Sequence, residues 1–169
     1  MLLFVIGAVV AVGLWQGLTS FLYAWALNFM LMLGVQYFID ALRFRLNSSY
    51  FDPKPWEHNG KMYRYFGVNV FRKLLVLIGW ERLHKAESPV LKKLEALKHL
   101  EQNTRKSELG HLIIFIIVFI VNLVVGIKYG FGQSIWLLVL NILLNAYPMA
   151  VQRYNRPRLN QIISRMEVH

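Results

Sequence analysis

Long runs without a charged side chain dominate the hydrophobic pattern of this chain. No Asp, Glu, Lys or Arg occurs in residues 1–39, 109–127 or 131–151, and most of the charged side chains lie in residues 40–108 and 152–169. A chain of 169 residues is too small to cover three such runs with its own polar shell. We therefore expect these runs to lie in a lipid bilayer as helices.

The three runs predict four helices, at about 2–16, 20–42, 109–127 and 131–151. A straight helix over residues 1–39 would be roughly 58 Å long, nearly twice the hydrocarbon core of about 30 Å. We therefore expect this run to reverse at its most polar stretch, residues 16–20. The first helix is short for a complete span, so a hairpin that enters the bilayer only partway is the alternative. It has no basic start, as a cleaved signal peptide would have, and is expected to be retained.

Positive charge is concentrated on one side of these helices. The net charge is +10, and eighteen of the nineteen Lys and Arg residues lie in residues 41–108 or after residue 151, leaving only Lys128 in the opposite connections. Because Lys and Arg favour cytoplasmic loops, we expect a multi-pass protein of the cell inner membrane with both termini and residues 43–108 in the cytoplasm. Anionic lipid headgroups account for the charge, and no nucleic-acid partner is expected.

The charged segment 43–108 carries helical patterns of its own. Two apolar faces recur at helical spacing, one formed by Phe71, Leu74, Leu75 and Ile78 and one by Val90, Leu94, Leu97 and Leu100. Ser88-Pro89 suits the start of the second of these helices. The patterns predict helices in the headgroup plane, with a cytosolic helical cap as the alternative. The predicted fold is an all-α integral membrane protein, a single membrane domain over residues 1–169 with about four transmembrane helices and cytoplasmic interfacial amphipathic helices.

The first candidate site lies at the start of the predicted third helix. Glu108 and His111 are three residues apart on one helical face, and Thr104 is one turn earlier. A carboxylate beside an imidazole raises its basicity and fixes its tautomer, as a general base for a hydroxyl group requires. Glu-x-x-His also occurs in metal sites of helical bundles, but usually in two copies, and this chain has one. The alternative role for His111 is that of an anchor at the headgroups.

The second candidate site lies at the end of the predicted fourth helix. Asn141 and Asn145 are one turn apart, and Pro148 cannot donate to the carbonyl of Leu144, so a kink is expected there. The following polar run contains Gln152, Arg153, Tyr154, Asn155, Arg156 and Arg158. Arginine binds phosphate or carboxylate in a bidentate manner. A positive-inside stop signal is the alternative, although such a signal needs only the charges.

A third and weaker group consists of Glu57, His58 and Asn59 before Gly60, for which a solvated loop is the alternative. The sequence contains no cysteine, no Gly-rich phosphate loop, no Gly-x-Ser-x-Gly and no His-Glu-x-x-His. These absences exclude a thiolate nucleophile and several common hydrolase and metalloprotease sites. No metal ion and no bound cofactor are expected.

The two stronger groups resemble a known family. Thr104-x-x-x-Glu108-Leu109-x-His111 and the run Asn145-x-x-Pro148 to Val151-Gln152-Arg153-Tyr154-Asn155-Arg156-Pro157-Arg158-Leu159 are similar to the glycosyl-diaponeurosporenoate acyltransferases of the staphyloxanthin pathway, the CrtO family. The resemblance includes Glu57, Gly60 and residues 71–75, and it covers roughly residues 55–165. It implies an integral membrane enzyme that moves a fatty acyl group onto a sugar hydroxyl of a glycosylated carotenoid.

This resemblance suggests an acyl transfer at the inner leaflet. We expect His111, steered by Glu108, to act as the base, and Asn145 or Gln152 to donate to the oxyanion. Acyl-CoA or acyl-carrier protein would be the co-substrate, with its phosphates held by Arg153, Arg156 and Arg158. Substrate binding would also involve Thr104, Glu57, Tyr154 and Asn155, and we expect residues 108–111 and 145–158 to share one cavity.

Two other classes of function stay open from the residues. One is another small membrane enzyme, such as a methyltransferase or a reductase, that holds a nucleotide-like cofactor at a late helix. The other is a lipid-binding membrane subunit without enzymatic activity. The expected partners in the leading hypothesis are membrane lipids, an acyl donor and a glycolipid or glycosylated carotenoid acceptor.

Overall fold

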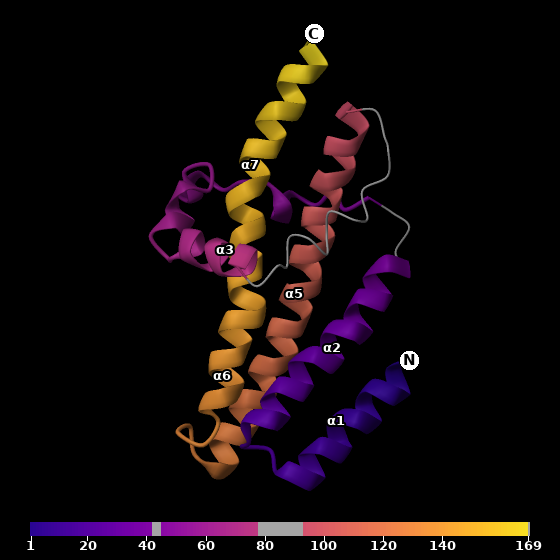
Figure 1. The fold of residues 1–169 in the computed structure, drawn as a ribbon, viewed down its shortest axis with the longest axis vertical. Helices are drawn as coiled ribbons and strands as arrows, with labels where there is room; N and C mark the ends of the chain where they lie inside the picture. Colours follow the sequence, from indigo (N-terminus) through magenta and orange to yellow (C-terminus); the bar gives the residue numbers. More distant parts are fainter. Residues whose placement is uncertain (42–44, 78–92, 169) are drawn as a thin grey trace. The chain divides into compact units, whose positions relative to one another are not determined.

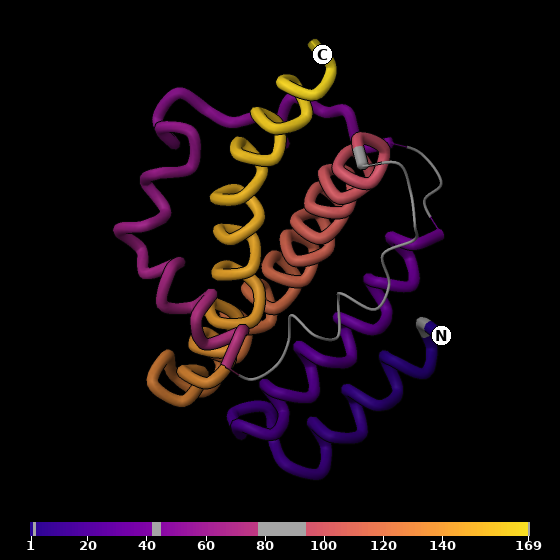
Figure 2. The backbone as a smooth tube through the Cα atoms, turned by 45° about the horizontal axis from the view of Figure 1, so that its top comes forward, coloured from indigo at the N-terminus to yellow at the C-terminus, as the bar shows by residue number. Residues whose placement is uncertain are grey.

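The computed structural model describes residues 1–41, 45–77 and 93–168, and every secondary-structure element within these ranges is helical (Figures 1 and 2). The α-helices are α1 (Leu2–Gln16), α2 (Phe21–Ala41), α3 (Val68–Leu77), α5 (Lys93–Tyr129), α6 (Ile135–Asn141) and α7 (Tyr147–Val168). Three short 3-10 helices are η1 (Ser49–Phe51), η2 (Pro55–Glu57) and η3 (Lys61–Arg64), and η4 (Ile142–Ala146) is a π-helical turn. The expected all-α class is confirmed.

The chain packs as two compact units, each built from two separate stretches of sequence. Unit 1 consists of Met1–Phe44 and Glu108–Pro148, and unit 2 consists of Arg45–Ser107 and Met149–His169. The boundaries fall inside α5 and α7, so each unit contains a part of both helices. The expectation of a single membrane domain over residues 1–169 stays a prediction.

A tight reversal joins α1 to α2 in unit 1. Gly17 takes a φ of 78° at the end of α1, a backbone conformation that glycine adopts without steric cost, and its amide donates to the carbonyl of Gly13 at 3.0 Å. The Ser20 hydroxyl then accepts from the amide of Tyr23 at 3.1 Å, which caps the start of α2. The expected reversal at residues 16–20 is confirmed, and α1 and α2 lie side by side (Figure 1).

Three helical segments are long and apolar enough to cross a membrane: Phe21–Ala41, Leu94–Tyr129 and Ile135–Val168. The 15 residues of α1 would extend only about 22 Å, less than the hydrocarbon core of about 30 Å. Three of the four expected spans are therefore supported by length and composition. A membrane-spanning role of α1 is not confirmed.

Helix α5 starts much earlier than the expected boundary at residue 109. It runs unbroken through 37 residues, roughly 55 Å, so Leu94, Leu97 and Leu100 belong to the same helix as the apolar run. The charged and apolar parts are continuous because no proline occurs between residues 93 and 129 and strong helix formers fill the junction. The separate interfacial helix expected from residue 90 onward is therefore wrong in the described part. Its proposed start at Ser88-Pro89 lies outside the described residues.

The first of the two expected amphipathic helices, with Phe71, Leu74 and Leu75 on its apolar face, forms α3 as far as Leu77, and Ile78 lies outside the described ranges. Leu74 on its apolar face is 51% exposed within the structure. An interfacial position is compatible with such an exposed face but is not confirmed.

The helix expected over residues 131–151 differs from the observed helices at both ends and in the middle. A turn follows Gly130, α6 begins at Ile135, and the π-turn η4 precedes Pro148. In η4 the amide of Tyr147 donates to the carbonyl of Ile142, five residues back. Pro148 then stands at the second residue of α7, where a missing amide hydrogen costs little, and α7 continues through Pro157 to Val168. The expected distortion at Pro148 thus takes the form of a π-turn, and the expected end at residue 151 is wrong.

Apolar side chains from α2, α5 and α6 form the core of unit 1. Its buried members are Tyr23, Ala24, Leu27, Ile114, Val118, Val125 and Leu137. This packing fixes the three helices of unit 1 that carry the polar side chains described below.

Replacing Lys106 with proline tests the continuity of α5. Proline cannot donate to the carbonyl of Gln102 and its ring clashes there, so we expect the variant to lose about 3 kcal/mol or more of stability. Lys106→Ala keeps the amide and a strong helix former, and its effect should stay within about 0.5 kcal/mol. Thermal unfolding of both variants in detergent, followed by circular dichroism, provides the comparison. Equal stability of the two would contradict a continuous helix.

Candidate functional site

A network of amide side chains holds His111 in unit 1. Asn145 on η4 is buried, and its Oδ1 lies 3.3 Å from Nδ1 of His111 on α5. The Nδ2 of Asn145 donates to Oδ1 of Asn28 on α2 at 2.8 Å and to Oδ1 of Asn141 at 2.9 Å. The network therefore joins the three candidate membrane-spanning segments, because each contributes at least one polar side chain.

Two backbone carbonyls set the direction of this network. Asn141 donates from Nδ2 to the carbonyl of Phe115 at 3.0 Å, and Asn28 donates from Nδ2 to the carbonyl of Ala24 at 2.8 Å. A carbonyl can only accept, so both amides must turn their oxygens toward Asn145. Asn145 must then present its Nδ2 to them and its Oδ1 to His111. The ring nitrogen Nδ1 therefore carries the hydrogen, and Nε2 of the neutral imidazole keeps its lone pair.

The π-turn before Pro148 contributes to the same arrangement. The carbonyl of Leu144 would normally accept from residue 148, but proline has no amide hydrogen. This carbonyl lies close to the His111 ring. A π-turn at a proline thus places one backbone acceptor and the side chain of Asn145 next to the imidazole.

Glu108 stands one turn before His111 on α5 and is fully buried. A carboxylate at such a position needs partners within the protein. Its expected role in steering His111 stays a prediction. The described contacts of His111 are those to Asn145 and Leu144.

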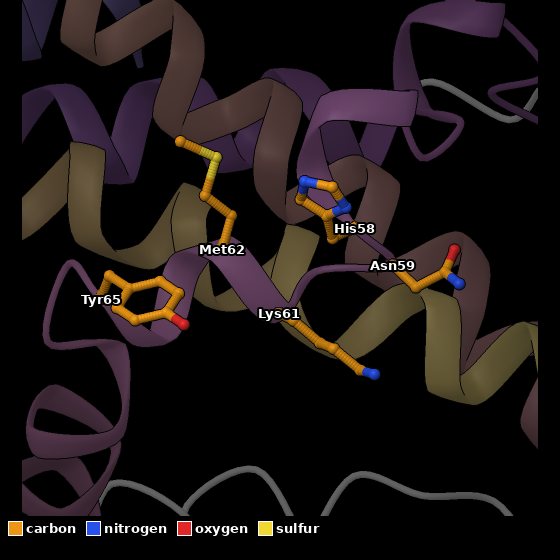
Figure 3. A pocket seen from close by; sticks show the side chains of 5 residues that line it. All are labelled: His58, Asn59, Lys61, Met62 and Tyr65. Atoms are coloured by element: carbon orange, nitrogen blue, oxygen red, sulfur yellow. The ribbon is translucent and has the colours of Figure 1, made fainter.

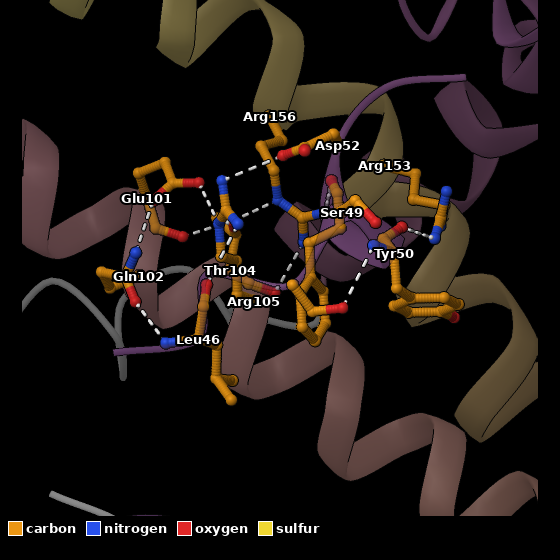
Figure 4. Close-up of polar contacts among 12 residues, drawn as sticks. Leu46, Ser49, Tyr50, Asp52, Glu101, Gln102, Thr104, Arg105, Arg153 and Arg156 are labelled. Carbon is orange, nitrogen blue, oxygen red and sulfur yellow. Dashed lines mark hydrogen bonds and ion pairs between the residues drawn. The ribbon is translucent and has the colours of Figure 1, made fainter. Parts of the chain in front are cut away.

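A buried arginine ties together three segments of unit 2 (Figure 4). Arg156 on α7 is 1% exposed, and its guanidinium donates to the hydroxyl of Thr104 at 3.0 Å, the carbonyl of Thr104 at 3.1 Å and the carbonyl of Phe51 at 2.8 Å. Arg105 similarly donates to the carbonyl of Leu46 at 3.0 Å and pairs with Glu101. The two arginines fix residues 46–51 against α5 and α7.

Arg153 forms an ion pair with Glu57, another carboxylate that is only 1% exposed. Its Nη1 lies 2.6 Å from Oε1 of Glu57, while its Nη2 donates to the carbonyl of Tyr50 at 2.9 Å and the guanidinium stacks over the ring of Tyr50. The Glu57 carboxylate also accepts from the amide of Lys54 at 2.9 Å and from the hydroxyl of Tyr63 at 2.7 Å. The ion pair fixes the segment from η1 to η3 on α7.

The titration of Glu57 and Tyr63 reflects this shared contact. Burial alone would raise the pKa of Glu57, but hydrogen bonds from Lys54, Tyr63 and Arg153 and the charge of Arg153 outweigh it and lower the pKa below its usual value. Burial, the hydrogen bond to Glu57 and the negative charge of Glu57 raise the pKa of Tyr63 well above its usual value. The ionised carboxylate and the neutral phenol are therefore the stable pair at neutral pH.

The loop after Glu57 has an unusual backbone and borders a pocket. His58, Asn59 and Gly60 take φ values of 47°, 56° and 82° in succession. A methyl group on Gly60 would lie 3.0 Å from the carbonyl oxygens of both Arg153 and Tyr154, so only glycine fits this contact with α7. An open pocket of about 610 Å³ is lined by His58, Asn59, Lys61, Met62 and Tyr65 (Figure 3).

The other predicted site residues of unit 2 are less enclosed. Gln152 donates to the hydroxyl of Ser107 at 3.3 Å, and Asn155 is half-buried. Tyr154 is buried, and the exposed Arg158 stacks over its ring at 4.0 Å. Within the described ranges, no three His, Asp or Glu side chains gather where they could bind a metal ion.

The structure brings many of the predicted residues together. His111 meets Asn145 within unit 1, and within unit 2 Thr104 meets Arg156 and Glu57 meets Arg153. The sequence analysis missed Asn28 and Tyr63. Asn28 carries a recognisable signal, because it is an amide in the interior of an apolar helix, where a polar side chain needs a partner. Tyr63 carries none, since tyrosine is common at membrane interfaces.

Comparison with known proteins gives a family match over most of the chain. A family model described as glycosyl-4,4'-diaponeurosporenoate acyltransferase, CrtO, matches residues 47–165. No curated protein and no solved structure gives a match. The matched range includes His111, Asn145 and Arg156 and excludes Asn28.

Gly60→Ala measures the importance of the close contact between this loop and α7. The positive φ should cost about 1–2 kcal/mol and the overpacked methyl group about 1–3 kcal/mol more. Gly130→Ala is the control, because Gly130 also has a positive φ, 98°, and nothing within 4 Å of the added carbon. Thermal unfolding should therefore show the larger loss for Gly60→Ala. Equal losses would mean that the loop does not lie tightly on α7.

Glu57→Gln tests the buried ion pair through its pH dependence. The pKa of Glu57 is lowered in the folded protein, so its stabilising contribution is present above its usual value of 4.5 and lost as the pH falls through the lowered pKa. The variant should lose about 3 kcal/mol at neutral pH and show a flatter stability profile in acid.

Glu167→Gln removes an exposed carboxylate that pairs with Lys98 and should cost less than about 1 kcal/mol. Unfolding midpoints between neutral and acidic pH distinguish the two variants. A profile of Glu57→Gln as steep as that of the unmodified protein would contradict the assigned ion pair.

Proposed function

The chain belongs to the glycosyl-4,4'-diaponeurosporenoate acyltransferase family, and on this premise we propose that it transfers a fatty acyl group from a thioester donor to a sugar hydroxyl of a glycosylated carotenoid or a related glycolipid. The donor is acyl-CoA or acyl-carrier protein, and the reaction needs no further cofactor. Membership in an acyltransferase family favours this reaction over a methyltransferase, a reductase or a lipid-binding subunit.

The observation that carries the mechanism is the directed network around His111. Because Nδ1–H is held by Asn145, the lone pair of Nε2 is free to accept a proton from a hydroxyl group. An acceptor hydroxyl attacks the thioester carbonyl as its proton moves to Nε2. The new bond joins the sugar oxygen to the acyl carbon, the bond between acyl carbon and sulfur breaks, and the proton leaves with the thiolate. The reaction requires no covalent intermediate on the protein.

Asn145 then acts as the positioning residue of this base. Both of its amide hydrogens are donated, to Asn28 and Asn141, which argues against the role of an oxyanion donor. Gln152 gives one amide hydrogen to Ser107 and has a second one, and the expectation that it donates to the oxyanion stays a prediction. Glu108 is proposed to support His111 electrostatically from the preceding turn of α5.

We propose two different roles for the arginines of α7. Arg153 and Arg156 already donate to protein acceptors, and we assign them, with Glu57 and Thr104, to the framework that shapes unit 2. Arg158 is exposed, and Asn155 and Tyr154 lie in the same stretch of α7. These three residues are our proposed contacts to substrate.

We further propose a multi-pass position in the cell inner membrane with both termini and residues 43–108 in the cytoplasm. The support is the bias of Lys and Arg described above together with three helical segments of sufficient length and apolar character. A cytoplasmic position of residues 43–108 would give this segment access to a cytoplasmic acyl donor.

The decisive test is His111→Gln. Glutamine can still accept or donate a hydrogen bond but cannot act as a base at neutral pH, so transfer should fall by about 100-fold to 10,000-fold. The assay supplies acyl-CoA and membranes that contain glycosyl-4,4'-diaponeurosporenoate, and it measures the acylated product by mass spectrometry.

His99→Gln is the matched control, because His99 is an exposed histidine of the same helix that the mechanism does not use. It should retain nearly full activity. Asn145→Ala should reduce the rate less than His111→Gln, because the base is still present and loses only the hydrogen bond that orients its ring. Full transfer by a well-folded His111→Gln protein would overturn the assignment of the base.

A further inference from the structure

A cluster of arginines surrounds a buried tyrosine in unit 2, away from the framework of Arg153 and Arg156. Tyr154 on α7 is 3% exposed. The guanidinium carbon of Arg158, one turn later on α7, lies 4.0 Å from the centre of its ring, and that of Arg72 on α3 lies 5.5 Å from it. The ring thus keeps two guanidinium groups from different helices near each other.

A third positive charge belongs to the same neighbourhood. Arg64 ends η3, which contacts α3, the helix of Arg72, and its charge acts on the Tyr154 hydroxyl together with those of Arg72 and Arg158. Arg64 and Arg158 are exposed, and Arg72 is half-buried. Within the parts of the chain that the structure describes, no ion pair involves any of these three arginines. Like charges repel, so an arrangement of this kind is stabilised by an anion.

We propose that Arg64, Arg72 and Arg158, arranged around Tyr154, form a binding site for a phosphate group. A guanidinium group donates two parallel hydrogen bonds to a phosphate and keeps its charge at every physiological pH. A guanidinium group has five N–H donors, so one that contacts an aromatic ring keeps donors for a ligand. A single carboxylate offers fewer acceptors and less charge than a phosphate, so it fits a group of several arginines less well.

This inference rests on the proposed function in one respect, namely that an acyltransferase must hold a donor. Coenzyme A and the phosphopantetheine arm of acyl-carrier protein both carry phosphate, and so do anionic lipid headgroups. The shared chemistry is the phosphate group, and the two sources are separated by experiment. The sequence analysis assigned this role to Arg153, Arg156 and Arg158, of which only Arg158 remains in the cluster.

The experiment compares two double variants that remove the same charge from the same helices. Arg72→Gln/Arg158→Gln removes two members of the cluster. Lys73→Gln/Arg165→Gln removes two exposed positive charges from α3 and α7 that lie outside the cluster. The full-length protein is placed in phosphatidylcholine nanodiscs, and coenzyme A binding is measured by calorimetry. In a second arm the nanodiscs also contain phosphatidylglycerol, and the lipid retained by the protein is counted by native mass spectrometry.

We expect the cluster variant to lose at least about tenfold in affinity for one of the two probes, while the control variant changes less than about twofold. A selective loss of coenzyme A binding identifies the donor as the source of the phosphate, and a selective loss of phosphatidylglycerol identifies a lipid headgroup. Either result supports a phosphate site. Equal losses in both variants, or no loss in either arm, would overturn it.

A charge-retaining variant keeps the test valid if the glutamine pair does not fold. Arg72→Lys/Arg158→Lys preserves the charges but not the bidentate geometry, and it should weaken binding by about threefold to tenfold. Unchanged affinity in this variant would contradict a guanidinium site. Because no arm requires acyl transfer, a negative result leaves the role of His111 to be decided by its own variant.

Discussion

The arrangement around His111 follows from one constraint, the need of every polar group among apolar helices to find its partner within the protein. Water cannot solvate Asn28, Asn141 and Asn145 in such surroundings, so each amide must satisfy another group. The side-chain amides of Asn141 and Asn28 each donate to a backbone carbonyl, which can only accept a hydrogen bond. The polarity of all the intermediate bonds is then determined, and with it the tautomer of the imidazole. A requirement of folding thereby leaves one nitrogen of the imidazole as a hydrogen-bond acceptor.

The same constraint operates on charges in unit 2. The guanidinium of Arg156 is removed from solvent, and its hydrogen bonds to Thr104 and Phe51 replace the lost water. The pair of Glu57 and Arg153 combines a buried carboxylate with several donors, which makes it costly to remove one partner alone. These contacts fix the short helices of residues 49–64, in which Phe51 is the one buried apolar side chain. Polar interactions therefore supply the order that a hydrophobic core supplies in unit 1.

The sequence predicted helix positions that depend on the local pattern of residues. It did not predict side-chain pairings that depend on contacts between distant parts of the chain. Gly17 predicts the end of α1 and Ser20 predicts the start of α2. The apolar runs locate the candidate membrane-spanning helices. The start of α5 was misplaced because a change from charged to apolar composition does not itself end a helix. The pairing of His111 with Asn145 depends on the packing of α5 against η4, which periodicity cannot specify. The candidate residues were largely correct, while their partners required three-dimensional information.

The arginine run of α7 shows why proximity in sequence is a poor guide to shared function. Three arginines within six residues suggest one anion clamp, but a helix turns successive side chains to different faces. Arg153 and Arg156 are three residues apart and both point to the segment of residues 50–57, where carboxylate and carbonyl oxygens receive them. Arg158 is four residues from Tyr154 and lies over its ring instead. Helical geometry thus divides a single basic motif into two arginines that bind the segment of residues 50–57 and an exposed one, Arg158, that lies over Tyr154.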